Sequence, residues 1–183
     1  MRVLTGIGLL LAGGIGSLTA QHRGQVEIGA FGSYTRYDSG FQLDNQFGSG
    51  GRLGFFLGDH FSLEVDGSVT QPRSKFSGVG TTTVMFGSAS LVISSGSAYV
   101  LGGYSRLHVG QNPPNSASQL NAVHGGLGER IFFVDDRVAL RVEARAYYRG
   151  PGGGMASPHW VGHFTGTVGL SFLLGRGGEK QGH

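Results

Sequence analysis

The segment at residues 137–149 limits the possible folds more than any other part of the chain. Its sequence, RVALRVEARAYYR, alternates between two kinds of residue. One parity holds Val138, Leu140, Val142, Ala144, Ala146 and Tyr148, and the other holds Arg137, Arg141, Glu143, Arg145 and Arg149. An extended strand separates these sets onto opposite faces, whereas a helix would mix them. Such a strand fits either a soluble sheet that buries its apolar face or an outer-membrane barrel that turns this face to lipid.

Composition favours the barrel. Charged residues make up 14% of the 183 residues, well below the roughly 25% that is usual for a soluble domain. The apolar fraction of 39% is too low for a helical membrane protein, and a net charge of +3 is too small to indicate nucleic-acid binding. The absence of cysteine excludes disulfides, thiolate metal sites, catalytic thiols and lipid attachment through cysteine.

The first twenty residues have the three-part layout of a secretory signal peptide. A charge at Arg2 is followed by an apolar run over residues 3–15 and by a small-residue segment that ends at Ala20. We expect cleavage near Ala20, or one residue earlier because Leu18 is not the ideal small residue. A retained anchor is the alternative, but the glycines of this segment weaken it as a permanent helix. Residues 21–24 then form a short N-terminal segment.

From residue 25 onward, eight stretches have the length that a tilted strand needs to cross a bilayer. The predicted strands are 25–37, 46–57, 61–70, 81–93, 98–109, 121–133, 137–149 and 163–174. The apolar face of 81–93 and of 121–133 is not settled by the pattern. The connections alternate between long and short, as in a meander with its short turns at one end. We therefore predict an all-β fold, an eight-stranded antiparallel up-and-down transmembrane β-barrel over residues 25–174, followed by a polar tail at 175–183.

Aromatic residues near the strand ends indicate girdles at the two membrane interfaces. Core or cross-strand packing is the alternative for some of them. The residues assigned to the girdles are Tyr34, Tyr37, Phe61, Tyr99, Phe132, Phe133, Tyr147, Tyr148, Trp160 and Phe172.

A barrel of eight strands has a lumen that side chains can fill. If the apolar rows face lipid, eight ionic residues have inward parity: Glu27, Arg52, Glu64, Asp66, Arg106, Arg141, Glu143 and Arg145. These are four acids and four bases, and buried charges must be paired. We interpret them as a neutralising ion-pair network, with a narrow gated ion path through the same network as the alternative. The abundant glycines relieve crowding inside so small a barrel.

Catalytic and metal-binding patterns are weak. His159 and His163 are four residues apart, a spacing that forms a metal pair on a helix but not in a glycine-rich loop entering a strand. His124 with Ser88, Ser90 or Glu143 could form a hydrolase set, yet no nucleophile elbow supports it. We therefore predict no catalytic residue, no metal site and no cofactor.

With strands, loops and leader assigned, the chain resembles the small eight-stranded outer-membrane barrels, namely the OmpA-type transmembrane domain and its OmpX/Ail-like relatives. The resemblance lies in QVEIGAFGSYTRY at 25–37, GGRLGFFLGDHFSLEVDGS at 50–68, DDRVALRVEAR at 135–145 and TVGLSFLL at 167–174. The last segment is similar to the signal read by the barrel-assembly machinery, through Thr167, Gly169, Phe172 and Leu174. OmpA-type proteins often continue into a peptidoglycan-binding domain, but only residues 175–183 follow the last strand here, so the resemblance does not imply a cell-wall tether.

The resemblance implies a location in the bacterial outer membrane. It also implies contact with outer-membrane lipid and lipopolysaccharide, and with the barrel-assembly machinery and periplasmic chaperones during biogenesis. We expect a non-enzymatic role in envelope integrity or surface adhesion through the long loops. The alternatives are a narrow channel for ions or small solutes and a lipid-A-modifying enzyme.

Overall fold

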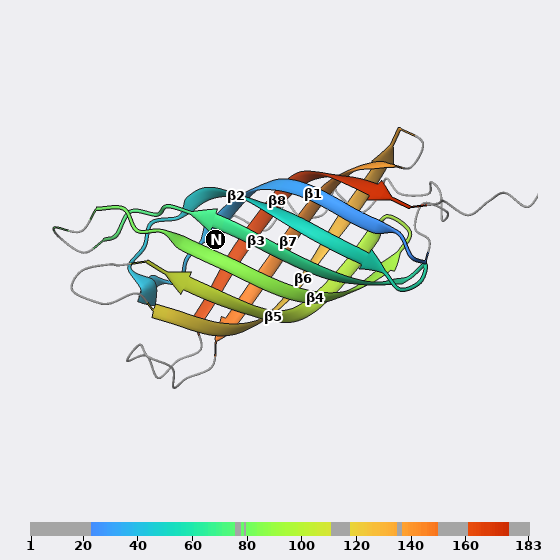
Figure 1. The fold of residues 1–183 in the computed structure, drawn as a ribbon. Coiled ribbons are helices and arrows are strands. Elements are labelled where there is room, and N and C mark those ends of the chain that lie inside the picture. Colours follow the sequence, from blue (N-terminus) through green and yellow to red (C-terminus); the bar gives the residue numbers. More distant parts are fainter. Residues whose placement is uncertain are drawn as a thin grey trace, which may run out of the picture.

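A computed structural model describes residues 23–75, 78, 80–110, 118–134, 137–149 and 161–175. They form one closed barrel in which each strand pairs antiparallel with the next and β8 pairs with β1 (Figure 1). The strands are β1 Val26–Arg36, β2 Gln46–Phe56, β3 Phe61–Thr70, β4 Val84–Ser95, β5 Ala98–Val109, β6 Ser118–Phe133, β7 Val138–Arg149 and β8 Val161–Leu174. The predicted all-β, eight-stranded fold is confirmed. The leader with Ala20, residues 176–183 of the tail, His159 and Trp160 lie outside the described residues.

Two strand boundaries differ from the sequence prediction by three residues. β4 begins at Val84 instead of residue 81, because Thr81 forms an isolated bridge with Arg73 in the preceding loop. β6 begins at Ser118 instead of residue 121, because its pairing with β5 continues to the partner pair Val109 and Ser118. β3 and β5 have the predicted bounds.

The connections are sorted by length between the two ends of the barrel. The short connections 57–60, 96–97 and 134–137 follow β2, β4 and β6, and this end is called the turn end below. The connections 37–45, 71–83, 110–117 and 150–160 follow β1, β3, β5 and β7 at the opposite end, the loop end. A short 3-10 helix, η1 (Ser39–Phe41), lies in the first of these. In the part of the chain that the structure describes, no helix is both long and apolar enough to span a membrane.

The outer surface of the barrel carries the apolar rows. Leu63 and Val65 on β3, for example, are about half exposed, while Glu64 between them is buried. β4, whose sides the sequence left open, turns Met85, Leu91 and Ile93 outward and Val84, Phe86 and Val92 inward. An apolar outer belt of this kind is stable only when lipid covers it.

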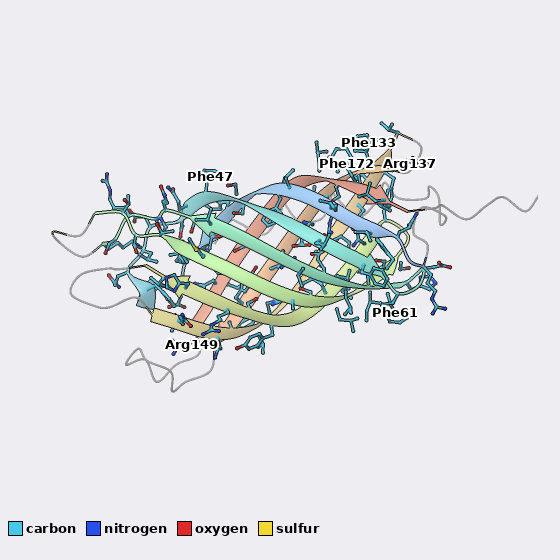
Figure 2. The ribbon with its side chains drawn as sticks, in the orientation of Figure 1. Phe47, Phe61, Phe133, Arg137, Arg149 and Phe172 are labelled. Carbon is cyan, nitrogen blue, oxygen red and sulfur yellow. The ribbon has the colours of Figure 1, made fainter. Side chains whose placement is uncertain are left out.

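The aromatic residues divide between the outer surface and the lumen. Figure 2 shows Phe47 toward the loop end and Phe61, Phe133 and Phe172 toward the turn end. Exposed positions confirm the outward placement of Tyr34, Phe61, Phe133, Tyr148 and Phe172. The prediction was wrong for Tyr37, Tyr99 and Tyr147, which are buried in the lumen, and Phe132 is half-buried on the inner row of β6.

Tyr99 and Tyr147 point inward because they share the parity of their strand's inner row, and Tyr37 continues the inward parity of Thr35 just past the end of β1. Tyr147 follows Arg141, Glu143 and Arg145 at intervals of two, so the pleat of β7 turns all four to the same side. Phe47 and Phe164, which the sequence analysis did not assign to a girdle, are exposed on the outer surface.

Glycines on the inner face make room for large lumen side chains. A Cβ atom added to Gly50 or Gly169 would collide with the ring or backbone of Phe31. A Cβ atom added to Gly128 would collide with Tyr99 and lie 2.7 Å from the carbonyl oxygen of Val142. The glycines at these positions therefore let two bulky rings fill a narrow barrel, as the composition suggested.

Candidate functional site

Arg141 is the centre of a charge network in the middle of the lumen. The alternation of β7 turns it inward together with Glu143 and Arg145, and its side chain is fully buried. Its Nη1 lies 2.7 Å from Glu27 Oε1 and 2.6 Å from Glu64 Oε2, and its Nη2 lies 3.1 Å from Glu143 Oε2. One guanidinium thus joins carboxylates from three strands, β1, β3 and β7.

Two further arginines, Arg145 and Arg52, pair with the carboxylates of the network. Arg145 Nη1 lies 2.6 Å from Asp66 Oδ2, and its Nη2 lies 3.0 Å from Glu64 Oε1. Arg52 on β2 lies 3.2 Å from Glu143 Oε2 and 3.6 Å from Glu64 Oε1 through its Nη1. Charged hydrogen bonds of this length are the strong kind, and each buried carboxylate therefore has a cation beside it.

The fourth base of the network is Arg130, not the predicted Arg106. Arg106 has the outward parity of β5, is exposed and donates a hydrogen bond to Gln119. Arg130 on β6 is fully buried, and its Nε lies 3.2 Å from Glu27 Oε2 at an angle that makes an ion pair without a hydrogen bond. The network thus still has four acids and four bases. The sequence analysis missed Arg130 because it did not assign the faces of this strand.

Aromatic rings pack against the buried guanidinium groups. The Tyr99 ring centroid lies 4.5 Å from Cζ of Arg130 and 4.7 Å from Cζ of Arg141. The Tyr99 hydroxyl donates to Glu143 Oε2 at 2.7 Å. Phe31 packs against Arg52 in the same way, with 4.6 Å between ring centroid and Cζ. Cation–π contacts of this kind are strongest where water is excluded, so they support the network in the lumen.

A smaller polar cluster lies farther toward the loop end, around His124. Its Nε2 is 2.8 Å from Ser90 Oγ and its Nδ1 is 2.7 Å from Ser105 Oγ, which in turn donates to Ser88 Oγ at 2.8 Å. The structure therefore brings His124 into contact with Ser90, as a hydrolase set would require, whereas Ser88 reaches the imidazole only through Ser105. All four side chains are buried, and serine occupies both ring nitrogens, so no carboxylate orients the imidazole.

Apolar side chains predominate at the loop end of the lumen, where the buried Thr35 and Thr165 hydrogen-bond to each other. Its core consists of Tyr37, Phe41, Leu43, Val84, Phe86, Leu107, Val109, Leu120, Ala122 and Tyr147. The connection after β1 folds into this mouth. The Phe41 ring of η1 lies 4.4 Å from the ring of His163, measured between centroids. The backbone N–H of Asp38 donates to His163 Nδ1 at 3.1 Å.

Tyr37 and His163 at this mouth are both fixed by contacts with neighbouring side chains and backbone. Burial raises the pKa of Tyr37 to about 12, so its phenol stays protonated and hydrogen-bonds Thr70. The described residues contain no group of three or more side chains that could hold a metal ion. The imidazole of His163 instead packs against Phe41 and Tyr37.

The arrangement resembles known outer-membrane barrels. A model of the OprF membrane domain matches residues 3–149. The N-terminal β-barrel domain of Pseudomonas aeruginosa OprF is 20% identical, with a TM-score of 0.57 over 84% of this chain and 100% of that chain. Ail, the attachment invasion locus protein of Yersinia pestis, is 14% identical, with a TM-score of 0.56 over 83% of this chain and 99% of that chain.

OprG from Pseudomonas aeruginosa is 9% identical, with a TM-score of 0.56 over 86% of this chain and 99% of that chain. Identities this low show the shared fold alone. A comparison with curated proteins gave no match. The family model, however, covers well over half of the sequence, and the closed barrel with its apolar belt agrees with it. The chain therefore belongs to the OprF membrane domain family and is an eight-stranded β-barrel of the bacterial outer membrane.

Proposed function

We propose that this barrel is a non-enzymatic protein that supports envelope integrity or surface contact through its long loops, while its lumen stays closed to ions. The observation that carries the proposal is the filling of the lumen in two layers. The charge network occupies its middle, and the apolar cluster with Phe41 occupies its loop end. A cavity bordered by Phe41, Tyr147 and His163 has a volume of only about 10 Å³.

A permeating ion would have to separate paired charges and cross an apolar layer. Leaving one partner of a buried pair uncompensated costs about 3–5 kcal/mol. An ion would also leave its hydration shell on reaching the apolar cluster, whose members are all uncharged side chains. These two costs support a closed lumen.

At the loop end, two of the connections are held to each other and form a surface that can contact other molecules. The connection after β3 is held to the connection after β1 by an isolated bridge between Leu43 and Ser74. The exposed Lys75 and Asp44 lie 3.9 Å apart across the same two segments. Loops that are positioned by a rigid scaffold commonly carry binding functions. The name of the similar Ail barrel, attachment invasion locus protein, is consistent with such a role on that protein.

The last strand is proposed to serve biogenesis. Phe172 and Leu174 are exposed near the end of β8, while Thr167 is buried and accepts a hydrogen bond from Arg52 at 3.4 Å. Gly169 lies against Phe31. This exposed terminal pair supports recognition by the barrel-assembly machinery with its periplasmic chaperones. The outer apolar belt supports contact with membrane lipid and lipopolysaccharide.

A narrow channel is the second candidate, and the polar cluster around His124 favours it. Its hydroxyl groups extend the polar part of the lumen beyond Arg145 toward the loop end. The lipid-A-modifying enzyme has less support, because the serines that contact His124 are buried inside the barrel and away from lipid. An unchanged mass of lipid A on expression is the expected result for the non-enzymatic proposal.

Planar-bilayer recording separates the closed lumen from the channel. We expect no reproducible single-channel steps for the wild-type protein. The proposal of a closed lumen would be overturned by single-channel steps that Arg141→Ala abolishes and Arg137→Ala leaves intact. Arg137 is the matched control because it is an exposed arginine just before the same strand. Migration of unboiled against boiled protein on a gel verifies that each variant has folded.

The contact role is tested in cells. A strain that lacks the protein is expected to become more sensitive to detergent or to lose surface adhesion, and the wild-type gene should restore the phenotype. A strain with intact envelope resistance and unchanged adhesion would contradict the proposed role.

A further inference from the structure

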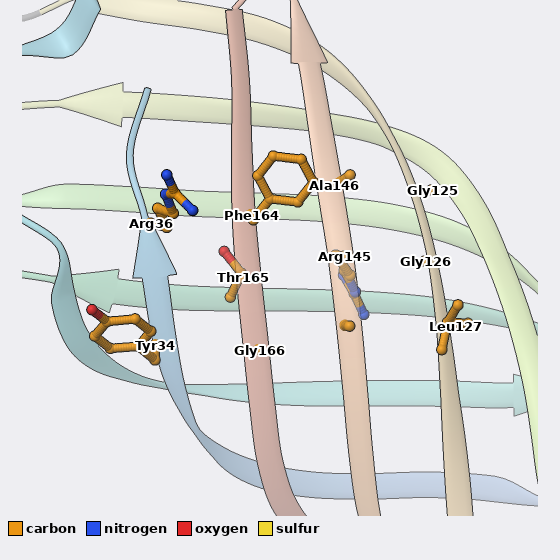
Figure 3. A pocket seen from close by; sticks show the side chains of 11 residues that line it. Tyr34, Arg36, Gly125, Gly126, Leu127, Arg145, Ala146, Phe164, Thr165 and Gly166 are labelled. Atoms are coloured by element: carbon orange, nitrogen blue, oxygen red, sulfur yellow. The ribbon is translucent and has the colours of Figure 1, made fainter. Parts of the chain in front are cut away.

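The outer surface has a groove of about 540 Å³ over four neighbouring strands at the loop half of the barrel (Figure 3). The strand registers show how it is built. One row across the wall runs from Tyr34 through Gly166 and Ala144 to Leu127. Large side chains thus stand at both ends of this row, and small residues lie between them.

The next row toward the loop end bounds the groove over β1 and β8. It runs from Arg36 through Phe164 and Ala146 to Gly125. Toward the turn end, the corresponding row contains Val168 and Val142, which are larger than the residues of the floor. The groove is therefore a depression with aromatic and aliphatic walls, a floor of glycine and alanine, and an arginine at its upper rim.

The surroundings of the groove determine what can occupy it. Its walls belong to the apolar belt, where Tyr34, Leu127 and Phe164 are about half exposed, so the medium around it is lipid. An empty groove would leave these side chains without contacts on one side, which forfeits dispersion energy. A polar occupant would lose its hydrogen bonds to water. A hydrocarbon chain fills the groove and has no hydrogen bonds to lose.

Arg36 adds a charge requirement to this hydrocarbon site. It is the last residue of β1, points outward and is exposed. No carboxylate among the described residues forms an ion pair with Arg36. Because the long loops of such barrels face outward, this end of the strand lies at the headgroups of the outer leaflet. A guanidinium binds phosphate through paired, charged hydrogen bonds.

We propose that this groove binds one acyl chain of a phosphorylated glycolipid of the outer leaflet, lipid A, and that Arg36 pairs with the phosphate of the same molecule. The site rests on the proposed contact with outer-membrane lipid and is independent of whether the lumen conducts. Its failure would therefore leave the bilayer recordings unaffected, and an open lumen would leave the lipid site unaffected.

Native mass spectrometry of the purified barrel tests the site with three probes: bisphosphorylated lipid A, its dephosphorylated form and phosphatidylethanolamine. We expect one retained molecule of bisphosphorylated lipid A per chain, bound in preference to the other two. Arg36→Gln should weaken this binding about tenfold and remove the preference for phosphate. Arg137→Gln, at the turn end, should change neither.

A second pair of variants tests the hydrocarbon part. Ala144→Leu fills the floor of the groove and should weaken the binding of both forms of lipid A. Ala89→Leu makes the same change on the outer face of β4, on the opposite side of the barrel, and should have no effect. Both alanines face outward, so folding should survive, and gel migration of unboiled protein confirms it.

Three results would overturn the proposal. Equal retention of all three lipids would indicate a general lipid annulus. Binding that neither Arg36→Gln nor Ala144→Leu weakens would place the lipid elsewhere. A dimer that Ala144→Leu dissociates would identify a second copy of the chain as the occupant.

Discussion

The two halves of the lumen are equally buried but chemically opposite. Toward the turn end and the middle, four arginines and four carboxylates fill the barrel, and at the loop end an apolar cluster fills it. Arg141 is 1% exposed and Leu107 is 2% exposed. Burial inside a lipid-embedded barrel therefore does not require apolar residues. It requires that the volume be filled and that each buried polar group have a partner.

The two halves also differ in what holds them together. The charge network joins residues of β1, β2, β3, β6 and β7, so every member belongs to the hydrogen-bonded wall. The apolar cluster includes Phe41 from a connection outside the barrel wall, which the isolated Leu43–Ser74 bridge holds to the connection after β3. Disrupting the network should therefore lower the stability of the whole barrel, whereas disrupting the cluster should also open its loop end locally.

The largest loss of stability is expected on replacing Arg130, and the matched control is the same replacement at Arg106. Arg130→Met should lower the free energy of unfolding by about 3 kcal/mol, because Glu27 loses one of its two cations in a buried site. Arg106→Met, on the outer surface, should cost less than about 0.5 kcal/mol. Urea titration of the barrel in lipid vesicles measures both. Equal costs would mean that Arg130 contributes nothing through its charge.

The charged half of the lumen could largely be predicted from the sequence. In β3 and β7 the ions alternate with apolar residues near the centre of the strand, where an outward charge would face hydrocarbon. The same rule failed for Arg106, because this residue lies near the loop end of β5, where an outward guanidinium reaches the headgroups at little cost. Near the loop end of a strand, parity alone therefore does not decide the face of an ion, whereas Glu27 near the turn end of β1 follows the rule.

A signal for Arg130 was nevertheless present in β6. Leu127, Ile131 and Phe133 share one parity, and the crowded Gly126 and Gly128 share the parity of Arg130. The adjacent Glu129 obscured this pattern, since it points outward and accepts a hydrogen bond from Ser97 at 3.1 Å.

The apolar half could not be predicted in the same way. Where the lumen is itself apolar, both faces of a strand carry apolar side chains and the alternation disappears. β4 shows this at Val84, Met85 and Phe86, whose sides the sequence left open. The fold could be predicted because it depends on strand length and loop sorting, whereas the inner partners depend on contacts between distant strands.

Phe41 provides the test of the apolar half, with Phe47 as its control. Phe41→Ala should lower the free energy of unfolding by about 2 kcal/mol, less than the 3–5 kcal/mol of a rigid core site, because the loop can relax. It should also speed proteolysis within residues 37–45. Phe47→Ala, on the outer surface, should cost less and leave proteolysis unchanged. If the two variants behave alike, Phe41 does not close the loop end.

The smallest loss of stability is expected from filling the space beside the network. Two glycines of β6 provide the comparison. Gly128→Ala places a Cβ atom against Tyr99 and 2.7 Å from the backbone oxygen of Val142, which cannot move without distorting the wall. Displacing Tyr99 would also strain its hydrogen bond to Glu143. We expect a loss of about 1 kcal/mol in the same urea titration, at the lower end of overpacking costs. Gly125→Ala, outward on the same strand with 3.8 Å to its nearest neighbour, should be neutral. If Gly128→Ala were equally neutral, the side chains of the network could shift at no cost. The proposal that a fixed network closes the lumen would then lose its main support.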